Sequence, residues 1–377
     1  MDARALAALA ANPGCRRRAL LDGAGIDKGA LARALGSPAS FGQSQFAIQR
    51  GHSFEARVTA DRGEALVRLL HERLRDGSPA PAPGGVDAPD LTAAGPQGRT
   101  ARTALALREA TAAGRWALLD HPMVSLDVAG SPAFLEPDAI VVHPDGSWSV
   151  VEIKSFPMVD GSADPAKVGA AARQSAVYAL ALERVAARVG ELKPDGGPGA
   201  DGGGAARTAR VRHQVLLVCP KDFSNLPTAE LVDVRKQLSV TRRQLTRLTR
   251  IEDIAAALPE GTTFDLRLAD DGRTATRPVD ELTTAVEAVD AAYAPECLAA
   301  CELAVHCRAR SRGAGAVESL GRGVRGELGG LTTVEAVLAA ALETDAGPTG
   351  DPAVDALRRA AALRAEALAA PGAAVCR

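Results

Sequence analysis

The sequence predicts an α/β or α+β protein in which helices surround one buried sheet, with helical additions at both ends of the chain. Strand-like runs of β-branched residues are followed by Ala-rich segments with helical spacing, an order that is typical of such folds. The chain has 377 residues, a length that suits two to three domains or one domain with additions. Its 46% of apolar residues is enough to bury a substantial core.

Charge and composition exclude several classes of protein. Lys and Arg total 44 against 46 for Asp and Glu, so the net charge of −2 excludes a polycation and limits nucleic-acid contact to a local basic face. Aromatic residues make up only 3%, which argues against a base-stacking platform. No apolar run reaches the roughly 18 residues of a membrane span, and the N-terminus lacks the pattern of a secretion signal. We therefore expect a cytoplasmic protein with no membrane partner.

Composition divides the chain into four segments. The first has apolar residues at helical spacings of three and four, and the second is a linker rich in Pro, Gly and Ala. The third holds the α/β core and a cysteine cluster, and the fourth is an Ala-rich helical tail. These segments are residues 1–78, 79–98, 99–312 and 313–377.

Within the last two segments the pattern predicts further elements in order. A low-complexity Gly-rich loop separates an Ala-rich helix from a buried strand of β-branched residues, and a long helix, a hairpin and a shorter helix follow. We expect the helix at 164–189, the loop at 193–206, the strand at 211–219, the long helix at 228–258, the hairpin at 264–275, a helix to about Ala294, and tail helices at 334–343 and 351–369.

The most informative stretch is a predicted hairpin with strands at 138–143 and 147–155. Asp145-Gly146 between two apolar runs is a strong turn signal. Pairing the strands would bring Asp138 beside Glu152 near one end of the sheet. Glu152 and Lys154 are two residues apart and therefore share a face, while Ile153 points into the core.

Two carboxylates and an ammonium group on one face suit catalysis. Carboxylate oxygens can hold Mg²⁺ or Mn²⁺, which polarises a phosphoryl oxygen and lowers the pKa of bound water. Lys154 can orient that water or offset charge that develops on a phosphate. The alternative is an exposed strand on which Asp138, Glu152 and Lys154 form only surface ion pairs.

Pro137-Asp138 and Glu152-Ile153-Lys154 resemble the motif of the PD-(D/E)xK nuclease superfamily. The resemblance implies a restriction-endonuclease-like core, with a central mixed sheet flanked by helices. It also implies that the Ile153 carbonyl is a further metal ligand.

Two helical motifs extend the resemblance to the RecB-type and Cas4-type members. Arg50-Gly51, followed by Glu55, matches their R-G-x-x-x-(H/E) helix and implies that Glu55 is a third carboxylate ligand; the alternative is an exposed helix glutamate. Gln174 and Tyr178 match their Q-x-x-x-Y helix and share one helix face at i, i+4 spacing. The resemblance implies that this pair supports the active site and contacts the nucleic-acid backbone; otherwise Tyr178 is a core residue with its hydroxyl at the rim.

Three of the six cysteines are clustered, as Cys297, Cys301 and Cys307. Clustered thiols in a chain without a secretion signal indicate a metal rather than disulfides. With Cys15, the trio resembles the four ligands of the 4Fe–4S cluster in Cas4-type and AddB-type nucleases, although its first gap is one residue longer. Zinc is the alternative, with His306 as an additional candidate ligand. We expect Cys219 to be a packed thiol, and Cys376 has no predicted role.

Residues 234–250 carry six positive charges and no acids. On a continuous helix, four of them would form one stripe that could contact phosphates, and the alternative is a solvated face paired with acids from elsewhere. The four are Lys236, Arg243, Arg247 and Arg250.

Together these features predict a metal-dependent DNA nuclease of the RecB/Cas4 type. The resemblance implies DNA repair or defence against foreign DNA, alongside a helicase or another partner; the chain has no Walker A sequence, so any motor is a separate chain. One alternative is a non-catalytic nucleic-acid-binding or scaffold subunit with the same fold. Another is a zinc-stabilised protein in which the Glu152-x-Lys154 pattern is coincidental.

Overall fold

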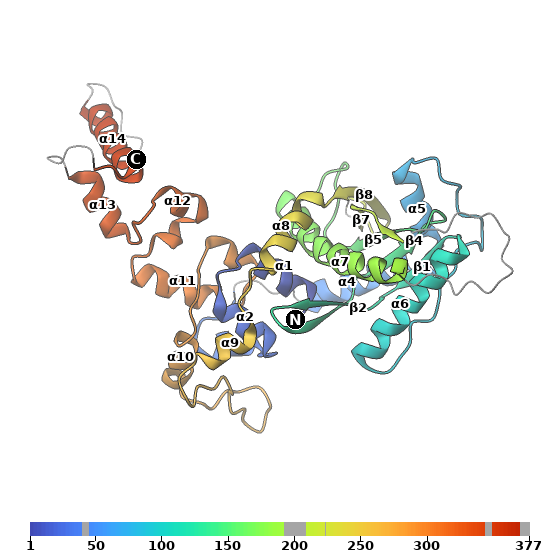
Figure 1. Cartoon of the computed structure of the whole chain (residues 1–377), viewed down its shortest axis with the longest axis horizontal. Helices are drawn as coiled ribbons and strands as arrows, with labels where there is room; N and C mark the ends of the chain where they lie inside the picture. The colour runs from blue at the N-terminus through green and yellow to red at the C-terminus, as the bar shows by residue number, and fades with distance from the viewer. Residues whose placement is uncertain (40–44, 192–208, 223, 344–348, 370–377) are drawn as a thin grey trace. The chain divides into compact units, whose positions relative to one another are not determined.

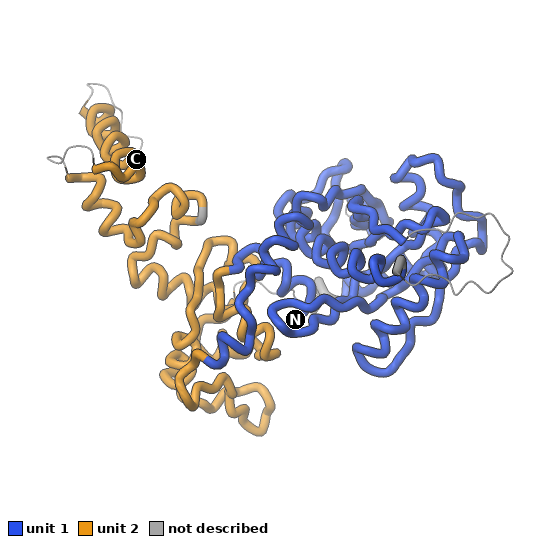
Figure 2. Tube along the Cα trace, viewed as in Figure 1, with its two compact units in different colours: residues 1–13, 42–256 blue, residues 14–41, 257–377 orange. Residues whose placement is uncertain are grey.

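The structure, a computed structural model, describes residues 1–39, 45–191, 209–222, 224–343 and 349–369. They form two compact units, and each unit consists of two separate segments of the chain (Figure 2). Unit 1 comprises Met1–Pro13 and Gly42–Ala256, and unit 2 comprises Gly14–Phe41 and Ala257–Arg377.

Unit 1 is built around a mixed sheet with the strand order β1-β4-β5-β7-β8, and β6 also pairs with β5 (Figure 1). Strand β5 runs parallel to β6 and β7, and the other neighbouring strands are antiparallel. A separate hairpin is formed by β2 and β3. The strands are β1 (Ala117–Asp120), β2 (Val124–Val128), β3 (Ser131–Leu135), β4 (Ala139–Val142), β5 (Ser147–Ile153), β6 (Arg210–Val211), β7 (Gln214–Pro220) and β8 (Pro227–Asp233).

Helices cover both faces of this sheet. All seven residues of β5 are buried, as expected of a central strand rich in β-branched residues. One face packs against α4 (Gln45–Val58) and α5 (Glu64–Leu74), where Phe54 and Leu70 join Val151 in a core cluster of buried side chains. Burying each such side chain stabilises the fold by about 2 kcal/mol.

The opposite face carries α7 (Pro165–Glu191), which connects β5 to its parallel neighbour β7. Ala171 of this helix packs with Leu217 and Cys219 of β7. Helix α6 (Gly95–Ala113) contributes Thr111, whose hydroxyl accepts a 2.8 Å hydrogen bond from the indole of Trp148 in β5. Helix α1 (Ala3–Ala11) packs on α7 and α8. The coarse prediction of an α/β protein with a helix-flanked sheet is therefore confirmed.

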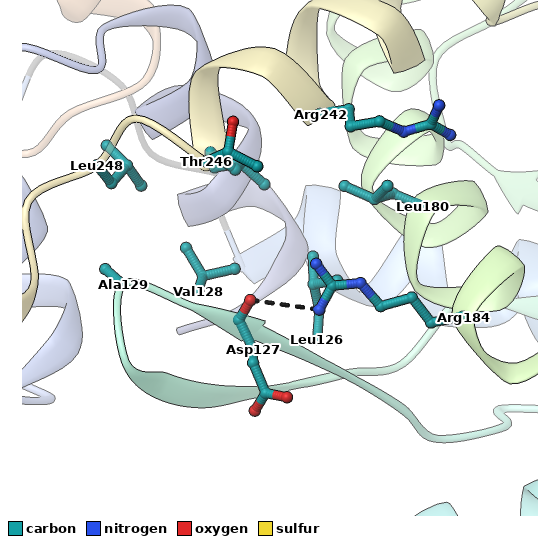
Figure 3. Close-up of a pocket in the computed structure, with 10 residues that line it drawn as sticks. Leu126, Asp127, Val128, Ala129, Leu180, Arg184, Arg242, Thr246 and Leu248 are labelled. Atoms are coloured by element: carbon teal, nitrogen blue, oxygen red, sulfur yellow. Dashed lines mark hydrogen bonds between the residues drawn. The ribbon is translucent and has the colours of Figure 1, made fainter. Parts of the chain in front are cut away.

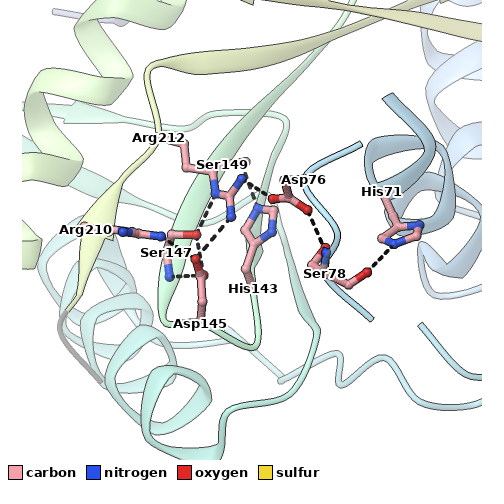
Figure 4. A network of polar contacts seen from close by, with 9 residues as sticks. All are labelled: His71, Asp76, Ser78, His143, Asp145, Ser147, Ser149, Arg210 and Arg212. Atoms are coloured by element: carbon pink, nitrogen blue, oxygen red, sulfur yellow. Dashed lines mark hydrogen bonds and ion pairs between the residues drawn. The ribbon is translucent and has the colours of Figure 1, made fainter. Parts of the chain in front are cut away.

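The predicted β4–β5 hairpin is present, and a polar network holds its turn (Figure 4). Asp145 Oδ1 accepts a 2.9 Å hydrogen bond from the Ser147 amide, and Gly146 adopts the positive φ of 84° that the turn requires. Arg212, beside β5, donates to Ser147 Oγ at 2.6 Å and pairs with Asp145 at 3.2 Å. The turn thereby fixes the register between β4, which Asp138 directly precedes, and β5, which contains Glu152.

Three predicted elements differ from the structure. The helix expected to run to about Ala294 is α10 and ends at Glu287. The helix expected at 228–258 is instead β8, α8 (Arg235–Leu245) and α9 (Ile251–Ala256), because the first part pairs with β7 along its full length. The hairpin expected at 264–275 has a single bridge, between Leu268 and Ala275, and forms no regular strands. The predicted loop at 193–206 lies outside the described residues.

Unit 2 is helical in its described residues. Its core joins α2 and α3 of the N-terminal segment to α10 and the cysteine region of the C-terminal segment, through Leu21, Leu31, Leu282 and Leu303. The two helices expected in the tail are present as α13 and α14, and they pack against each other. The elements of this unit are α2 (Arg16–Gly23), α3 (Lys28–Ala34), α10 (Val279–Glu287), η1 (Pro295–Ala299), α11 (Ala304–Gly313), η2 (Val317–Leu320), α12 (Arg322–Glu327), α13 (Val334–Leu342) and α14 (Pro352–Ala369).

No helix in the described parts of the chain is both long enough and apolar enough to cross a membrane.

Candidate active site

The register of the hairpin brings Asp138, Glu152 and Lys154 together at one end of the sheet in unit 1. Ala139 pairs with Val151, so Asp138 lies opposite Glu152. Asp138 Oδ2 accepts a 2.5 Å hydrogen bond from the Ile153 amide and lies 4.0 Å from Lys154 Nζ. Lys154 also forms an ion pair with Glu152 Oε1. The prediction that these three side chains lie close together is therefore confirmed.

Glu152 is fully buried, which is unusual for a carboxylate. Burial raises the pKa of Glu152 to about 7, against the attraction of Lys154, and the negative charge of Asp138 adds to the increase. Within the described residues, Oε2 has no hydrogen-bond partner. A buried oxygen without a partner costs free energy, so a bound cation would stabilise this arrangement.

Glu55 approaches the same site from α4. Its helix lies close to the end of β5, because a Cβ added at Gly51 would be 3.8 Å from Ser155 Cβ. Burial raises the pKa of Glu55, and the charge of Asp138 raises it further. The two carboxylates therefore interact electrostatically, and the role of Glu55 as a third carboxylate ligand stays a prediction. His52 on the same helix is exposed.

His121, which the sequence analysis missed, lies beside Glu55. Its Nε2 is 3.4 Å from Glu55 Oε1 and 3.9 Å from Asp120 Oδ1. Its backbone has a φ of 43°, and its amide donates to the Asp138 carbonyl at 3.1 Å. A positive φ is uncommon for a histidine and is often found at functional sites. In the sequence, Asp120-His121-Pro122 follows the apolar run 116–119, and no motif marks this histidine as functional.

Gln174 and Tyr178 lie on one face of α7 and reach the segment that precedes Asp138. Gln174 Nε2 donates to the Tyr178 hydroxyl at 3.0 Å, and that hydroxyl donates to the Glu136 carbonyl at 3.1 Å. Burial and the charge of Glu152 both raise the pKa of Tyr178, so its hydroxyl remains a donor. The pair therefore holds the backbone that positions Asp138.

The predicted basic stripe does not form on one helix. Helix α8 ends at Leu245, so Lys236 and Arg243 lie on the helix, while Arg247 and Arg250 lie on the chain beyond it. All four side chains are exposed, and Arg250 pairs with Glu252 at 3.5 Å. The expected alignment over four helical turns is wrong, because the backbone leaves the helix at Thr246.

A pocket of about 230 Å³ lies between α7, α8 and the β2–β3 hairpin (Figure 3). Leu126, Leu180 and Leu245 contribute apolar surface, and Arg184 donates to the Asp127 carbonyl at 3.5 Å. Arg242 at its edge pairs with Glu183. None of the predicted catalytic residues lines this pocket.

The four cysteines expected to bind metal all belong to unit 2. Cys15 directly precedes α2, Cys297 lies in η1, Cys301 lies between η1 and α11, and Cys307 lies in the first turn of α11. Burial raises the pKa of Cys301 to about 12, and the charges of Cys15 and Cys307 contribute to that increase. Cys15 and Cys297 likewise raise the pKa of Cys307, where burial is the largest cause. The thiols therefore interact with one another.

The chemistry of both donor sets fits the expected metals, although the side chains do not stand in a ligand arrangement. No group of three or more His, Cys, Asp or Glu side chains among the described residues is placed as a metal site. Three carboxylates with an unpartnered buried oxygen suit a hard cation, and four thiols suit iron–sulfur or zinc. Cys219 is fully buried in β7, as expected, and Cys376 lies outside the described residues.

Comparisons with family models, curated proteins and solved structures found no match to this chain. Its function has to be inferred from the two sites themselves.

Proposed function

We propose that the protein is a metal-dependent DNA nuclease whose core is of the restriction-endonuclease-like PD-(D/E)xK type. The observation that carries this proposal is Glu152, a fully buried carboxylate with one unpartnered oxygen, beside a lysine, Lys154, that also contacts Asp138. A purely structural ion pair would gain nothing from leaving that oxygen buried without a partner.

Asp138, Glu152 and Glu55 would hold Mg²⁺ or Mn²⁺, with the Ile153 carbonyl as a further ligand. Bound there, the cation would polarise the scissile phosphate and lower the pKa of a water molecule. Asp138 accepts a hydrogen bond from the Ile153 amide, which keeps its carboxylate at the end of β5. Glu152 must be ionised to bind a cation, so at limiting metal concentration we expect cleavage to increase with pH and to level off above about pH 7.

Lys154 supplies the positive charge that this chemistry needs. Its Nζ contacts both carboxylates, and their charges raise its pKa against the opposing effect of burial. The ammonium group therefore remains charged at neutral pH and can orient the attacking water or offset charge on the phosphate.

The exposed Lys236, Arg243 and Arg247 make no ion pair within the described residues, so they are available to contact DNA phosphates.

We propose that Cys15, Cys297, Cys301 and Cys307 hold a 4Fe–4S cluster, with zinc as the alternative. The centre would be structural, because hydrolysis of a phosphodiester needs no redox step. A partner such as a helicase remains part of the proposal.

The test compares wild type with Lys154→Met, purified without oxygen, on linear and circular DNA in single- and double-stranded form. Lys221→Met is the matched control, since Lys221 is an exposed lysine just beyond β7. We expect cleavage with Mg²⁺ or Mn²⁺, none with EDTA, and a loss of at least about 100-fold in Lys154→Met only. A folded, metal-loaded wild type that cleaves none of the substrates would favour the binding or scaffold subunit instead.

A further inference from the structure

Arg17 is a buried arginine in unit 2 with an unusual set of partners. Its side chain is 7% exposed, and its Nε donates to the Val289 carbonyl at 3.1 Å. Its Nη1 donates to Cys307 Sγ at 3.2 Å. One backbone carbonyl and one sulfur are thus the hydrogen-bond acceptors of this guanidinium in the described structure.

The arginines on either side of Arg17 are paired differently. Arg16 is mainly exposed and pairs with Asp290 at 3.5 Å, and the buried Arg18 pairs with Asp22 at 3.0 Å. In the described residues, no carboxylate lies within ion-pair distance of Arg17. The nearby His306 cannot be its counter-ion, because an imidazole side chain is either neutral or positively charged.

A guanidinium cannot lose its proton in a protein, so burial does not neutralise Arg17 as it could a lysine. A buried charge without a counter-ion is strongly unfavourable. Neutral thiols do not compensate the charge, but metal-bound thiolates do. Four thiolates together outweigh the charge of a divalent zinc ion or an oxidised 4Fe–4S core, so the centre would be a net anion.

We propose that Arg17 is the counter-ion of an anionic metal–thiolate centre held by Cys15, Cys297, Cys301 and Cys307, and that it donates an N–H···S hydrogen bond to Cys307. This inference depends on the proposed cysteine-ligated centre and not on the nuclease activity. Arg17 is a positioning residue: it holds Cys307 and balances the charge of the centre. Its positive charge would also favour the reduced state of an iron–sulfur cluster.

The experiment measures metal retention and potential in the full-length protein, purified without oxygen, for wild type, Arg17→Gln, Arg17→Lys and Arg16→Gln. Metal content is measured by mass spectrometry, and release to a chelator in excess is followed by absorbance. We expect Arg17→Gln to release metal about 10-fold faster than wild type, as is typical when a partner of a metal ligand is lost. Arg17→Lys should release metal at a rate between those of wild type and Arg17→Gln, because it retains the positive charge. Arg16→Gln should release metal at the wild-type rate.

Each outcome separates the two proposals. A wild type without stoichiometric iron or zinc would refute the cysteine-ligated centre itself. A metal-loaded wild type whose release rate matches that of Arg17→Gln would refute the counter-ion role alone. Should Arg17→Gln fail to fold, Arg17→Lys decides: metal release at the rate of Arg16→Gln would refute the guanidinium–sulfur bond to Cys307, and faster release would support it.

Discussion

Glu152 lowers the stability of the metal-free protein at neutral pH, and it is also the residue that we propose binds the metal. In the folded chain burial raises its pKa to about 7, whereas an unfolded glutamate titrates near 4.5. The folded state therefore binds the proton more tightly. The resulting penalty is absent below about pH 4.5, grows between pH 4.5 and 7, and reaches about 3 kcal/mol above pH 7.

This penalty predicts that Glu152→Gln stabilises the metal-free protein at high pH while abolishing cleavage. The variant should exceed wild type in free energy of unfolding by about 3 kcal/mol at pH 8 and by almost nothing at pH 4.5. Urea unfolding in EDTA can be followed by tryptophan fluorescence, because Trp116 and Trp148 both lie in unit 1. A difference that does not change with pH would contradict the assigned pKa.

His143 makes the opposite contribution at the other end of the hairpin. It is 1% exposed, its Nε2 lies 2.8 Å from Ser149 Oγ, and its Nδ1 has no partner in the described structure (Figure 4). Burial lowers the pKa of His143 to about 4, so the folded state resists protonation. The stability it contributes is complete above about pH 6.5 and is lost as the pH falls toward 4.

We therefore predict that wild type loses about 3 kcal/mol relative to His143→Gln between pH 7 and pH 4. Urea unfolding followed by circular dichroism at both pH values measures this, with the exposed His52→Gln as control. If wild type and His143→Gln keep the same difference at both pH values, the histidine is not the acid-sensitive group.

The sequence was sufficient to place Asp138, Glu152 and Lys154, because each depends on local rules. The Asp-Gly turn sets the register, and the two-residue period of a strand puts Glu152 and Lys154 on one face. His121 could not be predicted, because its position depends on a positive φ and on how α4 docks against the sheet. Neither feature has a signal in a single sequence.

Among the elements, α7 does most to connect the core with the site. Ala171 packs against β7, while Tyr178 donates to the Glu136 carbonyl two residues before Asp138. Loss of the hydroxyl would free that backbone segment and leave Gln174 without its acceptor, at a cost of about 1 kcal/mol.

Tyr178→Phe should therefore lower kcat about 10-fold and raise the Mn²⁺ concentration needed for half-maximal cleavage, because Asp138 is held less firmly. The only other tyrosine, Tyr293 in unit 2, gives the matched control Tyr293→Phe. Equal metal dependence in the two variants, together with equal kcat, would rule out a positioning role for Tyr178.

The helix expected at 228–258 shows why elements could be predicted only in part. Leu231 and Val232 fit the spacing of a helix as well as a strand, so pattern alone did not decide. Pairing with the buried β7 decided in favour of a strand, because β7 would otherwise have left its backbone groups unpaired. Where no neighbouring strand competes for the backbone hydrogen bonds, as in α7, α13 and α14, the predicted helices are confirmed.

At the scale of the whole molecule, each unit combines two segments that are far apart in the chain. The four consecutive segments expected from composition therefore do not correspond to the two units. Residues 14–41 leave unit 1 and fold with 257–377, and their shared core includes Leu21, Leu31 and Leu282. Composition marks linkers but not such long-range pairing of segments, so the sequence could not predict it. The interleaving places all four candidate metal-binding cysteines in one unit.

This arrangement predicts that the cysteine centre stabilises unit 2 and not the sheet. In Cys301→Ser, limited proteolysis should cleave within 14–41 and 257–343, while 117–191 stays protected and the urea transition of the two tryptophans does not shift. Cys219→Ser is the matched control, since Cys219 is a buried thiol in β7 of unit 1. Peptides mapped by mass spectrometry identify the cleaved unit. The same cleavage pattern in Cys301→Ser, Cys219→Ser and wild type would mean that the thiols do not hold the two segments of unit 2 together.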